Sequence, residues 1–529
     1  MLTREEISAQ LKYEGGISRR WFMAYAGALA SIPWLGRSTQ VNAAPRFEVN
    51  PFSLGVASGE PDSQSVVLWT RLAPAPLDPN GGMPNEAVEV HWEIADDESF
   101  AKVVGSGREV ATPQLGHSVH VEAQGLQPDR WYWYRFRSGD AVSPIGRTRT
   151  VPTLDQSTPQ VKFAVTSCQN YEQGLFTAYE QMANDDLDLV IHLGDYIYEY
   201  EAGRNGKVRT HHGAEIQSLG DYRVRHSQYR SDPLLQGMHA VCPWMVTWDD
   251  HEVDNNCAGG VSEEQGIDPV EFLYRRANGY QAYYENMPLR KTSLPTGADM
   301  QLYRTISYGR LADFLVLDTR QYRTDQPNND KASPLNEAAL DKQQTMLGRQ
   351  QKNWMYRQLI SSTATWNVLA QQVMMGMVNR SNVPDTGKYS MDQWPGYAAE
   401  RMEIVRFMQE RRVANPVVLT GDIHSNWVNE LRIDDRDSDS AVVATEFVAT
   451  SLSSGGNGMA EPKYVPELMA KNACVKFHNT ERGYIRCTVT PDRWQADYMS
   501  VDDVLQPGGK TTVRSAFVVE AGNPTVKPA

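Results

Sequence analysis

The chain contains few cysteines, no surplus of basic residues, and no long apolar run outside its N-terminal segment. Five cysteines among 529 residues exclude a small scaffold held together by disulfides. Lysine and arginine total 51 against 65 acidic residues, a formal net charge of −14. We therefore expect no nucleic-acid binding, because phosphate backbones are bound by positive charge. A hydrophobic content of 41% excludes disordered and collagen-like chains, and the length favours two domains.

The N-terminal segment has the features of an export signal. Arg19 and Arg20 precede an apolar stretch, residues 21–36, which is shorter than the roughly 20 residues that cross a bilayer. Small residues up to Ala43 suit a signal-peptidase site. Residues 1–43 thus resemble a twin-arginine signal peptide, although an amphipathic or membrane-anchor helix would also fit. We expect the twin-arginine export machinery as a partner, a periplasmic or secreted location, and a mature protein that does not span the membrane.

The rest of the chain divides by the pattern of its strands. Residues 46–155 predict an all-β sandwich, because short β-rich runs alternate with Gly, Pro, Asp and Asn turns. From 158 to 500, buried strand runs alternate with helices, which predicts a layered α/β catalytic domain. The expected strands there are 161–165, 187–193, 245–248, 314–317, 366–370 and 417–419, and the expected helices are 176–184, 269–286, 349–361 and 398–412. Residues 501–529 are left as a C-terminal tail.

Polar side chains follow five of these strands. The strand ends carry Ser167-Cys168, Gly194-Asp195, Asp249-Asp250-His251, Asp318-Thr319-Arg320 and Gly421-Asp422-Ile423-His424. A single end of this kind is ordinary, because Asp favours turns. Five ends at one edge of an α/β sheet predict a metal centre. More than one ion is expected, since crowded carboxylates repel unless cations neutralise them, and paired ions suit phosphoryl transfer. Asp195 could bridge two ions.

The spacing Gly194-Asp195-x-x-Tyr198 narrows the choice of metal. Tyr198 could reach the same ion as Asp195, although a core tyrosine is the alternative. A phenol with a pKa near 10 binds as phenolate only to a strong Lewis acid, which favours ferric iron over zinc or magnesium. Zinc would call for more His and Cys together, whereas Asp and Asn oxygens suit calcium. For Arg320 a structural ion pair is favoured over a contact with substrate phosphate.

Six stretches of the chain together resemble the PhoD-type alkaline phosphatases, a branch of the metallophosphoesterases with a site related to that of purple acid phosphatases. The matching stretches are Ser167-Cys168-Gln169-Asn170, Leu193-Gly194-Asp195-Tyr196-Ile197-Tyr198-Glu199, Trp248-Asp249-Asp250-His251-Glu252-Val253-Asp254-Asn255, Asp318-Thr319-Arg320-Gln321-Tyr322-Arg323, Asp392-Gln393-Trp394-Pro395-Gly396-Tyr397 and Thr420-Gly421-Asp422-Ile423-His424. The resemblance implies a metallophosphoesterase-like β-sandwich flanked by helices, behind an immunoglobulin- or fibronectin-like N-terminal domain.

The resemblance also implies one ferric ion and two calcium ions. It assigns the iron to Cys168, Asp195 and Tyr198, with Asp195 bridging to calcium. Further metal ligands are expected at Asp249, Asn256 and Asp422. The residues expected beside the reacting phosphate are Asp250, His251 and His424; whether each of them binds metal or only the phosphate stays open.

The implied activity is hydrolysis of phosphoesters by a metal-bound hydroxide or oxide, with release of inorganic phosphate. Small-molecule monoesters are the leading substrates. Diesters in lipids or polymers, such as phospholipid headgroups or teichoic acids, come next, because the family includes enzymes described as phospholipase D. The other alternative is an exported metal-binding protein without catalysis. An oxidising location permits disulfides, and neighbouring cysteines suggest the pairs Cys242–Cys257 and Cys474–Cys487, although connectivity does not follow from sequence.

Overall fold

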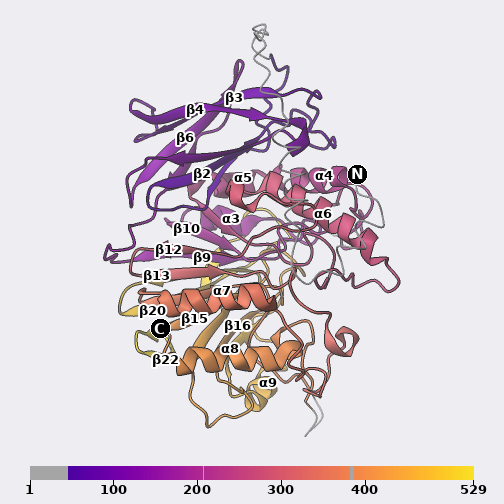
Figure 1. Ribbon diagram of the computed structural model, residues 1–529, viewed down its shortest axis with the longest axis vertical. Helices are drawn as coiled ribbons and strands as arrows, with labels where there is room; N and C mark the ends of the chain where they lie inside the picture. Colours follow the sequence, from indigo (N-terminus) through magenta and orange to yellow (C-terminus); the bar gives the residue numbers. More distant parts are fainter. Residues whose placement is uncertain (1–45, 207, 382–386) are drawn as a thin grey trace.

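The computed structural model describes residues 46–206, 208–381 and 387–529. It shows two large sheets stacked between helices, with a β module above them (Figure 1). The predicted signal peptide lies outside the described residues. Within these ranges, no helix is both long and apolar enough to cross a membrane.

The first large sheet has ten strands in the order β22-β21-β20-β19-β9-β10-β11-β1-β2-β5. Its strands are β22 (Asn523–Pro528), β21 (Thr511–Glu520), β20 (Arg493–Val501), β19 (Gly483–Val489), β9 (Val161–Thr166), β10 (Leu189–His192), β11 (Trp244–Val246), β1 (Val56–Gly59), β2 (Ser65–Arg71) and β5 (Ser118–Gln124). At its centre β9, β10 and β11 run parallel, so their carboxyl ends meet at one edge.

The second large sheet has seven strands in the order β12-β13-β14-β15-β17-β16-β18. Its strands are β12 (Arg304–Tyr308), β13 (Ala312–Val316), β14 (Trp366–Ala370), β15 (Pro416–Thr420), β17 (Ala444–Val448), β16 (Asn426–Leu431) and β18 (Val475–Asn479). Here β13, β14 and β15 are parallel. The strand runs expected from the sequence in both sheets are confirmed, with ends shifted by a few residues.

The main core lies between the two sheets. Phe163 on β9 and Phe314 on β13 meet edge to face, with ring centroids 5.3 Å apart. Side chains from both inner faces are excluded from water there, which is the main stabilising contribution of a sheet sandwich. The metallophosphoesterase-like α/β sandwich expected from the sequence is confirmed.

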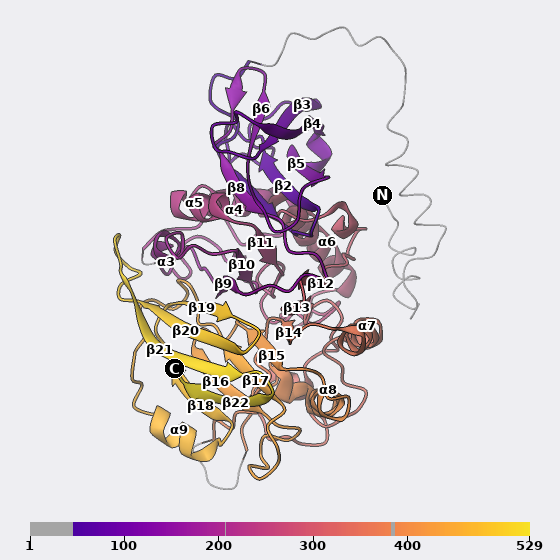
Figure 2. The same cartoon turned by 90° about the vertical axis from the view of Figure 1, so that its left-hand side faces the viewer.

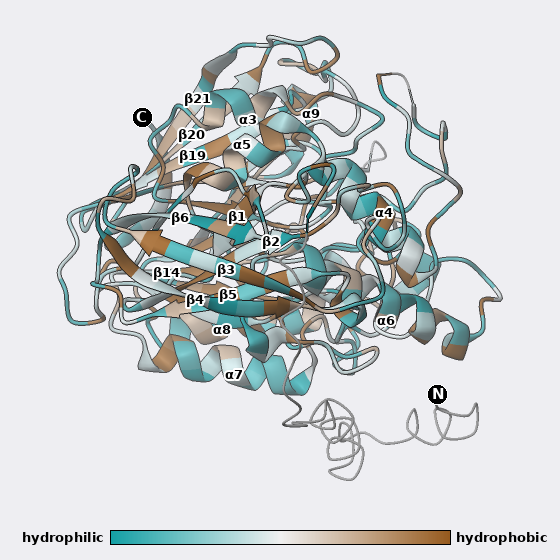
Figure 3. Ribbon diagram, turned by 90° about the horizontal axis from the view of Figure 1, so that it is seen from above, coloured by the Kyte–Doolittle hydropathy of each residue, from teal (hydrophilic) through white to brown (hydrophobic). Residues whose placement is uncertain are grey.

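Helices cover the outer face of each sheet. One group packs against the ten-stranded sheet: α3 (Thr177–Met182), α4 (Leu219–Arg230), α5 (Pro233–Val241) and α6 (Pro269–Asn286). On the seven-stranded sheet lie α7 (Gly348–Ser361) and α8 (Ala398–Glu410), and α9 (Val465–Lys471) contacts β18. In Figure 3, α7 and α8 lie along one margin, and hydrophilic teal residues are interspersed with apolar ones along α7. The short turns are η1 (Pro113–Leu115), η2 (Lys291–Ser293), η3 (Pro327–Asp330) and η4 (Trp394–Tyr397).

The start of α6 follows from its local sequence. The Asp268 side chain accepts a hydrogen bond of 2.8 Å from the Val270 amide, and Pro269 occupies the first helical position. Asp satisfies an amide that the helix leaves unpaired, and proline there needs no amide partner. The helix runs over the predicted residues 269–286. The other three predicted helices are confirmed with shorter or slightly shifted ends.

The N-terminal β module is the all-β sandwich expected from the sequence, and one of its two layers is continuous with the catalytic sheet. Its own sheet contains β4 (Val103–Ala111), β3 (Val88–Ala95), β6 (Trp131–Ser138), β7 (Ala141–Val142) and β8 (Gly146–Arg149). Its other strands, β1, β2 and β5, extend the ten-stranded catalytic sheet through a parallel contact of Gly59 with Trp244. A Cβ on Gly59 would lie 2.7 Å from the Trp244 carbonyl oxygen, so glycine permits the junction.

The segment after residue 500 is part of the catalytic sheet and not a tail. Residues of β21 pair antiparallel with β20, and β22 pairs with β21, at the yellow edge seen in Figure 2. Phe517 of β21 packs in the core between the two sheets. The alternating apolar residues of this segment, of which Phe517 is one, fit a half-buried strand pair.

The two expected disulfides are absent, since all five cysteines are free and buried. Cys487 lies on β19 in the inter-sheet core, whereas Cys474 belongs to a separate cluster around Trp427. Cys242 ends α5 and Cys257 lies in the loop after β11, both within apolar packing. Proximity along the chain therefore did not bring either pair together.

Candidate metal centre

The parallel strands of both sheets deliver a compact group of metal-ligand side chains to one edge. In each of three overlapping triads, the candidate ligand atoms lie within 4.8 Å of one another. The triads are Cys168, Asp195 and His424; Asp195, Asp250 and His251; and Asp249, Asp250 and Asp422. Asp195 and Asp250 each belong to two triads. The geometry therefore allows adjacent ions that share carboxylates, as expected for Asp195.

The backbone is strained where it presents these side chains. The φ angles are 58° at Cys168, 55° at Asp195, 46° at Asn256, 62° at Asp422 and 53° at His424. Left-handed conformations of this kind cost on the order of 1–3 kcal/mol each and persist where the surrounding structure enforces them. Their concentration at one edge of the sheets is typical of a functional site.

Two glycines let the strand-end loops approach one another closely. A Cβ on Gly194, whose φ is 108°, would collide with Asp249. A Cβ on Gly421 would collide with Ser167 beside Cys168. The glycine in each Gly-Asp pair is thus required for packing the carboxylate that follows it.

Tyr198 lies at the centre of the first triad, as its spacing from Asp195 predicts. Its hydroxyl donates a hydrogen bond of 2.8 Å to Asp195 Oδ2 and lies 3.1 Å from His424 Nε2. It also lies 2.9 Å from the Ser454 hydroxyl, which donates to the Cys168 carbonyl oxygen at 2.7 Å. Ser454 was not identified from the sequence, because a serine in a loop of small residues carries no distinguishing signal.

The buried carboxylate of Glu252 connects the loops that follow β10 and β11. Its carboxylate accepts hydrogen bonds from the backbone amides of Tyr196 at 2.5 Å, Asp249 at 2.7 Å and Asp195 at 3.1 Å. One buried carboxylate thereby fixes two strand-end loops relative to each other. In the sequence, only its place in the Asp249-Asp250-His251-Glu252 run points to Glu252, and that run does not predict its contacts with backbone amides.

His251 is oriented by a buried acid. Its Nδ1 lies 2.7 Å from Glu199 Oε2, while Glu199 Oε1 accepts from the Asn255 amide. Burial alone would lower the pKa of His251, but the negative charges of Glu199, Asp195 and Asp250 outweigh it and raise that pKa well above its usual value. The contact with Glu199 engages Nδ1 of His251 and leaves Nε2 for whatever occupies the site.

Arg320 forms ion pairs with several carboxylates of the site, which is the structural role that the sequence favours over a contact with substrate. Its guanidinium bonds Asp249 through Nε, Asp392 Oδ1 at 2.9 Å and Asp422 Oδ1 at 2.8 Å, and lies 3.4 Å from Asp250 Oδ1. The neighbouring Asp318 does not join the site. Its Oδ1 instead accepts from the backbone amide of Arg320 at 3.0 Å, within its own turn.

Asn256 lies beside the site rather than within a triad of His, Cys and acidic groups. Its backbone amide donates to Asp250 Oδ2, and its side-chain amide donates to Asp330 Oδ2, both at 2.6 Å. Because the nitrogen is held by Asp330, the amide oxygen is left for another partner. That orientation is compatible with a ligand role for Asn256.

The electrostatics of the site call for positive charge. Burial raises the pKa values of Cys168, Asp195, Tyr198 and Asp249 well above their ordinary ranges, and neighbouring carboxylates such as Asp195 add to the shift at Cys168 and Tyr198. Burial also raises the pKa of Asp422 to about 6, despite the opposing charge of Arg320. The single positive charge of Arg320 does not neutralise this group of acids, whereas bound divalent or trivalent cations would neutralise it.

Known proteins share both the sequence and this architecture. Residues 163–498 match the family of PhoD-like phosphatases, and residues 38–152 match the N-terminal domain of PhoD-like phosphatases. The chain is 50% identical over 513 residues to alkaline phosphatase D of Bacillus subtilis (strain 168), covering 95% of this chain and 87% of that relative. The solved structure of PhoD has 50% identity and a TM-score of 0.90, covering 92% of this chain and 93% of its own. The chain therefore belongs to the PhoD-like phosphatase family, a family of hydrolases.

Proposed function

We propose that this protein is an exported phosphatase that hydrolyses phosphoesters at a centre of one ferric and two calcium ions. The observation that carries the proposal is a pair of carboxylate oxygens, Asp195 Oδ1 and Asp249 Oδ2. Both are buried and have no hydrogen-bond partner among the described residues. A buried anionic oxygen is costly unless a cation or donor meets it, so each is suited to a metal ion.

The donor set around Cys168 favours iron. It combines a thiol, the Tyr198 phenol, the Asp195 carboxylate and the His424 imidazole within one small cluster. Thiolate and phenolate are basic ligands that a trivalent ion stabilises best, and thiolate is a poor ligand for calcium. We therefore assign the iron to Cys168, Asp195 and Tyr198, with His424 alongside.

The donor set around Asp250 favours calcium. Asp249, Asp250 and Asp422 bring their oxygens together, and the Asn256 amide lies beside them. Oxygen-only sites of several carboxylates and an amide suit calcium. Asp195 lies within reach of Asp250 as well as Cys168, which supports a bridging role between the iron and a calcium ion.

The ions, when bound, would polarise the phosphate and neutralise part of its charge. The chain then supplies orientation and protons. His251, fixed through Nδ1 by Glu199, is placed to donate a proton from Nε2 to the leaving oxygen. His424 Nε2 lies 3.1 Å from the Tyr198 hydroxyl, and Arg320 keeps Asp249 and Asp422 apart at fixed positions.

Substrate class is tested by comparing a monoester with a diester. The purified protein, loaded with iron and calcium, is assayed on para-nitrophenyl phosphate and bis(para-nitrophenyl) phosphate, with inorganic phosphate measured. We expect the monoester to be hydrolysed faster and phosphate to be released. A strong preference for the diester would favour the phospholipase D-like alternative. Absence of hydrolysis at full metal content would leave an exported metal-binding protein.

Export is tested by changing the paired arginines. Arg19 and Arg20 are each replaced by Lys, which preserves charge but removes the guanidinium groups. We expect the wild-type protein outside the cytoplasm and the variant inside it. Equal distribution of the two proteins between the fractions would contradict the twin-arginine route.

A further inference from the structure

A cavity of about 520 Å³ opens beside the metal centre. His424 lines this cavity and also belongs to the triad with Cys168 and Asp195, so the cavity and the centre share a wall. Cavities that bind organic ligands commonly measure roughly 300–1,000 Å³. A phosphate held at the centre would thus lie next to a space large enough for an organic leaving group.

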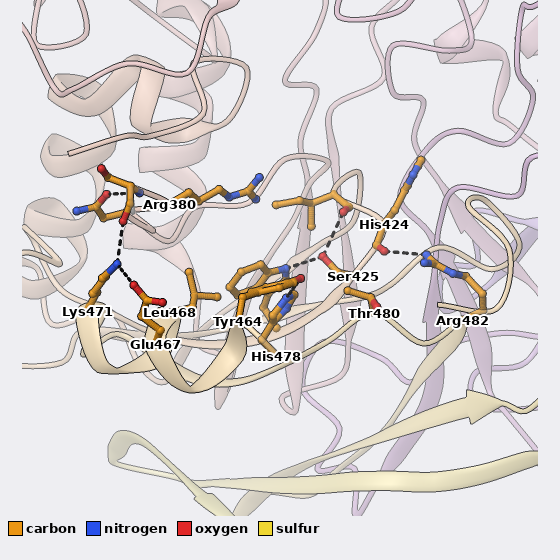
Figure 4. Close-up of a pocket in the computed structure, with 14 residues that line it drawn as sticks. Arg380, His424, Ser425, Tyr464, Glu467, Leu468, Lys471, His478, Thr480 and Arg482 are labelled. Atoms are coloured by element: carbon orange, nitrogen blue, oxygen red, sulfur yellow. Dashed lines mark hydrogen bonds and ion pairs between the residues drawn. The ribbon is translucent and has the colours of Figure 1, made fainter. Parts of the chain in front are cut away.

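The floor of the cavity is a fixed aromatic stack. The rings of Trp427 and His478 lie 3.6 Å apart between centroids, and both side chains are nearly fully buried. Tyr464, at 49% exposure, stands at the open side, with its hydroxyl 2.9 Å from His478 Nε2. His478 Nδ1 lies 3.1 Å from the Asn426 carbonyl oxygen, so this ring is held at both nitrogens. Figure 4 shows Tyr464 and His478 together beneath the cavity.

The cavity is positively charged in a protein whose formal net charge is −14. Arg380, Lys471 and Arg482 line it. Among the described lining residues Glu467 alone carries a carboxylate, and it pairs with Lys471 at 2.5 Å. Arg482 is engaged with the His424 carbonyl oxygen at 2.7 Å.

Arg380 is the cation best placed to meet a ligand. Its guanidinium carbon lies 5.9 Å from the centroid of the Trp427 ring, above the aromatic floor. In Figure 4 its side chain reaches from the Lys471 end of the cavity toward His424. An anionic group bound over the floor would therefore meet Arg380.

We propose that this cavity is the leaving-group subsite, and that it selects phosphoesters whose alcohol carries a flat ring and a second anionic group. The ring lies against Tyr464, the exposed aromatic side chain of the lining, whose hydroxyl contacts the buried Trp427–His478 stack, and Arg380 binds the second anion. The inference rests on the proposed phosphatase function. An exposed aromatic side chain close to a cation matches that combination, whereas a small neutral alcohol would leave both features unused.

The test compares three monoesters within each variant: para-carboxyphenyl phosphate, phenyl phosphate and glycerol phosphate. Ratios of kcat/KM between substrates are the readout, because a general loss of activity or metal cancels in a ratio. Replacement of Arg380 by Gln should lower the ratio of the carboxyphenyl ester to the phenyl ester about fivefold, and Tyr464→Ala should lower the ratio of phenyl ester to glycerol ester by a similar factor. The matched control Lys463→Gln changes the charge next to Tyr464 but lies outside the cavity lining, and should move neither ratio.

Each part of the proposal fails separately. An unchanged carboxyphenyl-to-phenyl ratio in Arg380→Gln overturns the assignment of the second anion, and an unchanged phenyl-to-glycerol ratio in Tyr464→Ala overturns the ring surface. If wild-type protein with full metal content hydrolyses none of the three esters, the phosphatase function itself fails. That result is distinguished from the others, because it leaves no ratio to compare.

Discussion

The hydroxyl of Tyr198 donates a hydrogen bond of 2.8 Å to Asp195, the carboxylate three positions before it. The contact arises because Asp195 leaves β10 in a left-handed conformation and the chain turns back at once. Burial raises the pKa values of both groups, and the Tyr198 proton lies between them. A strong Lewis acid at this position would replace that proton.

Replacement of Tyr198 by Phe should remove a visible absorption band from the iron-loaded protein. A phenolate bound to ferric iron absorbs visible light by charge transfer, and phenylalanine has no oxygen to bind. The control Tyr222→Phe removes a buried hydroxyl that donates to the Val253 carbonyl oxygen, away from the triads, and should keep the band. A band of equal intensity in Tyr198→Phe would exclude Tyr198 as an iron ligand.

Removal of calcium should abolish phosphatase activity, and added calcium should restore it. The variant Asp422→Asn removes one negative charge from the triad of Asp249, Asp250 and Asp422. Half-maximal activity should then require at least about tenfold more calcium. The exposed Asp439→Asn serves as the control and should titrate like wild type. Full activity in excess chelator would count against calcium dependence.

Arg320→Met should destabilise the protein by roughly 3–5 kcal/mol, because it leaves buried carboxylates without their shared cation. The comparison is Arg486→Met, whose ion pairs with Asp185 and Asp497 are partly exposed and should contribute less than about 1 kcal/mol. Denaturant midpoints of both variants measure the difference. Equal midpoints would mean that the Arg320 network contributes no more than a surface pair.

Stability should fall as the pH drops from neutral, partly through His120. Burial lowers its pKa to about 4 in the folded protein, against an ordinary value near 6.5. The unfolded state therefore binds the proton first, and stability is lost as the pH falls through 6.5 toward 4. For this one group, the loss between pH 7 and pH 5 is about 2 kcal/mol.

His120→Phe should remove that part of the pH dependence while retaining the stacking on Tyr284, whose ring centroid lies 4.4 Å away. Urea unfolding of both proteins at the two pH values gives the comparison. A wild-type-sized loss between pH 7 and pH 5 in the variant would show that His120 is not among the groups that titrate on unfolding.

The strand ends could be identified from the sequence, because buried runs and the polar residues that follow them are local features. This is why Cys168, Asp195, Asp249 and Asp422 were predicted to meet. The three-way contact of Tyr198 with His424 and Ser454 depends on loops from separate strands, and only Tyr198 and His424 carried a motif. The role of Glu252 was missed for the same reason, since backbone amides leave no trace in sequence.

The domain boundary was the least predictable part of the fold. The contact of Gly59 with Trp244 joins β1 of the N-terminal module to β11 within one sheet through a single residue pair, and nothing in the strand pattern distinguishes Gly59 from a turn glycine. The pairing of β21 with β20 was likewise not predictable, because alternating apolar residues indicate a strand but not which strand it pairs with. The disulfides suggested by short spacing do not form: Cys474 and Cys487 are buried in separate clusters, and Cys242 and Cys257 are both free within one cluster.

The assignment of iron to Cys168 is tested by the metal content of Cys168→Ser. Wild-type protein, the variant and the buried control Cys242→Ser are purified in parallel, and iron, calcium and phosphatase activity are measured in each. We expect about one iron and two calcium per chain in wild type and in Cys242→Ser, with iron and activity both lost in Cys168→Ser. Full iron content and full activity in Cys168→Ser would exclude Cys168 as the iron ligand.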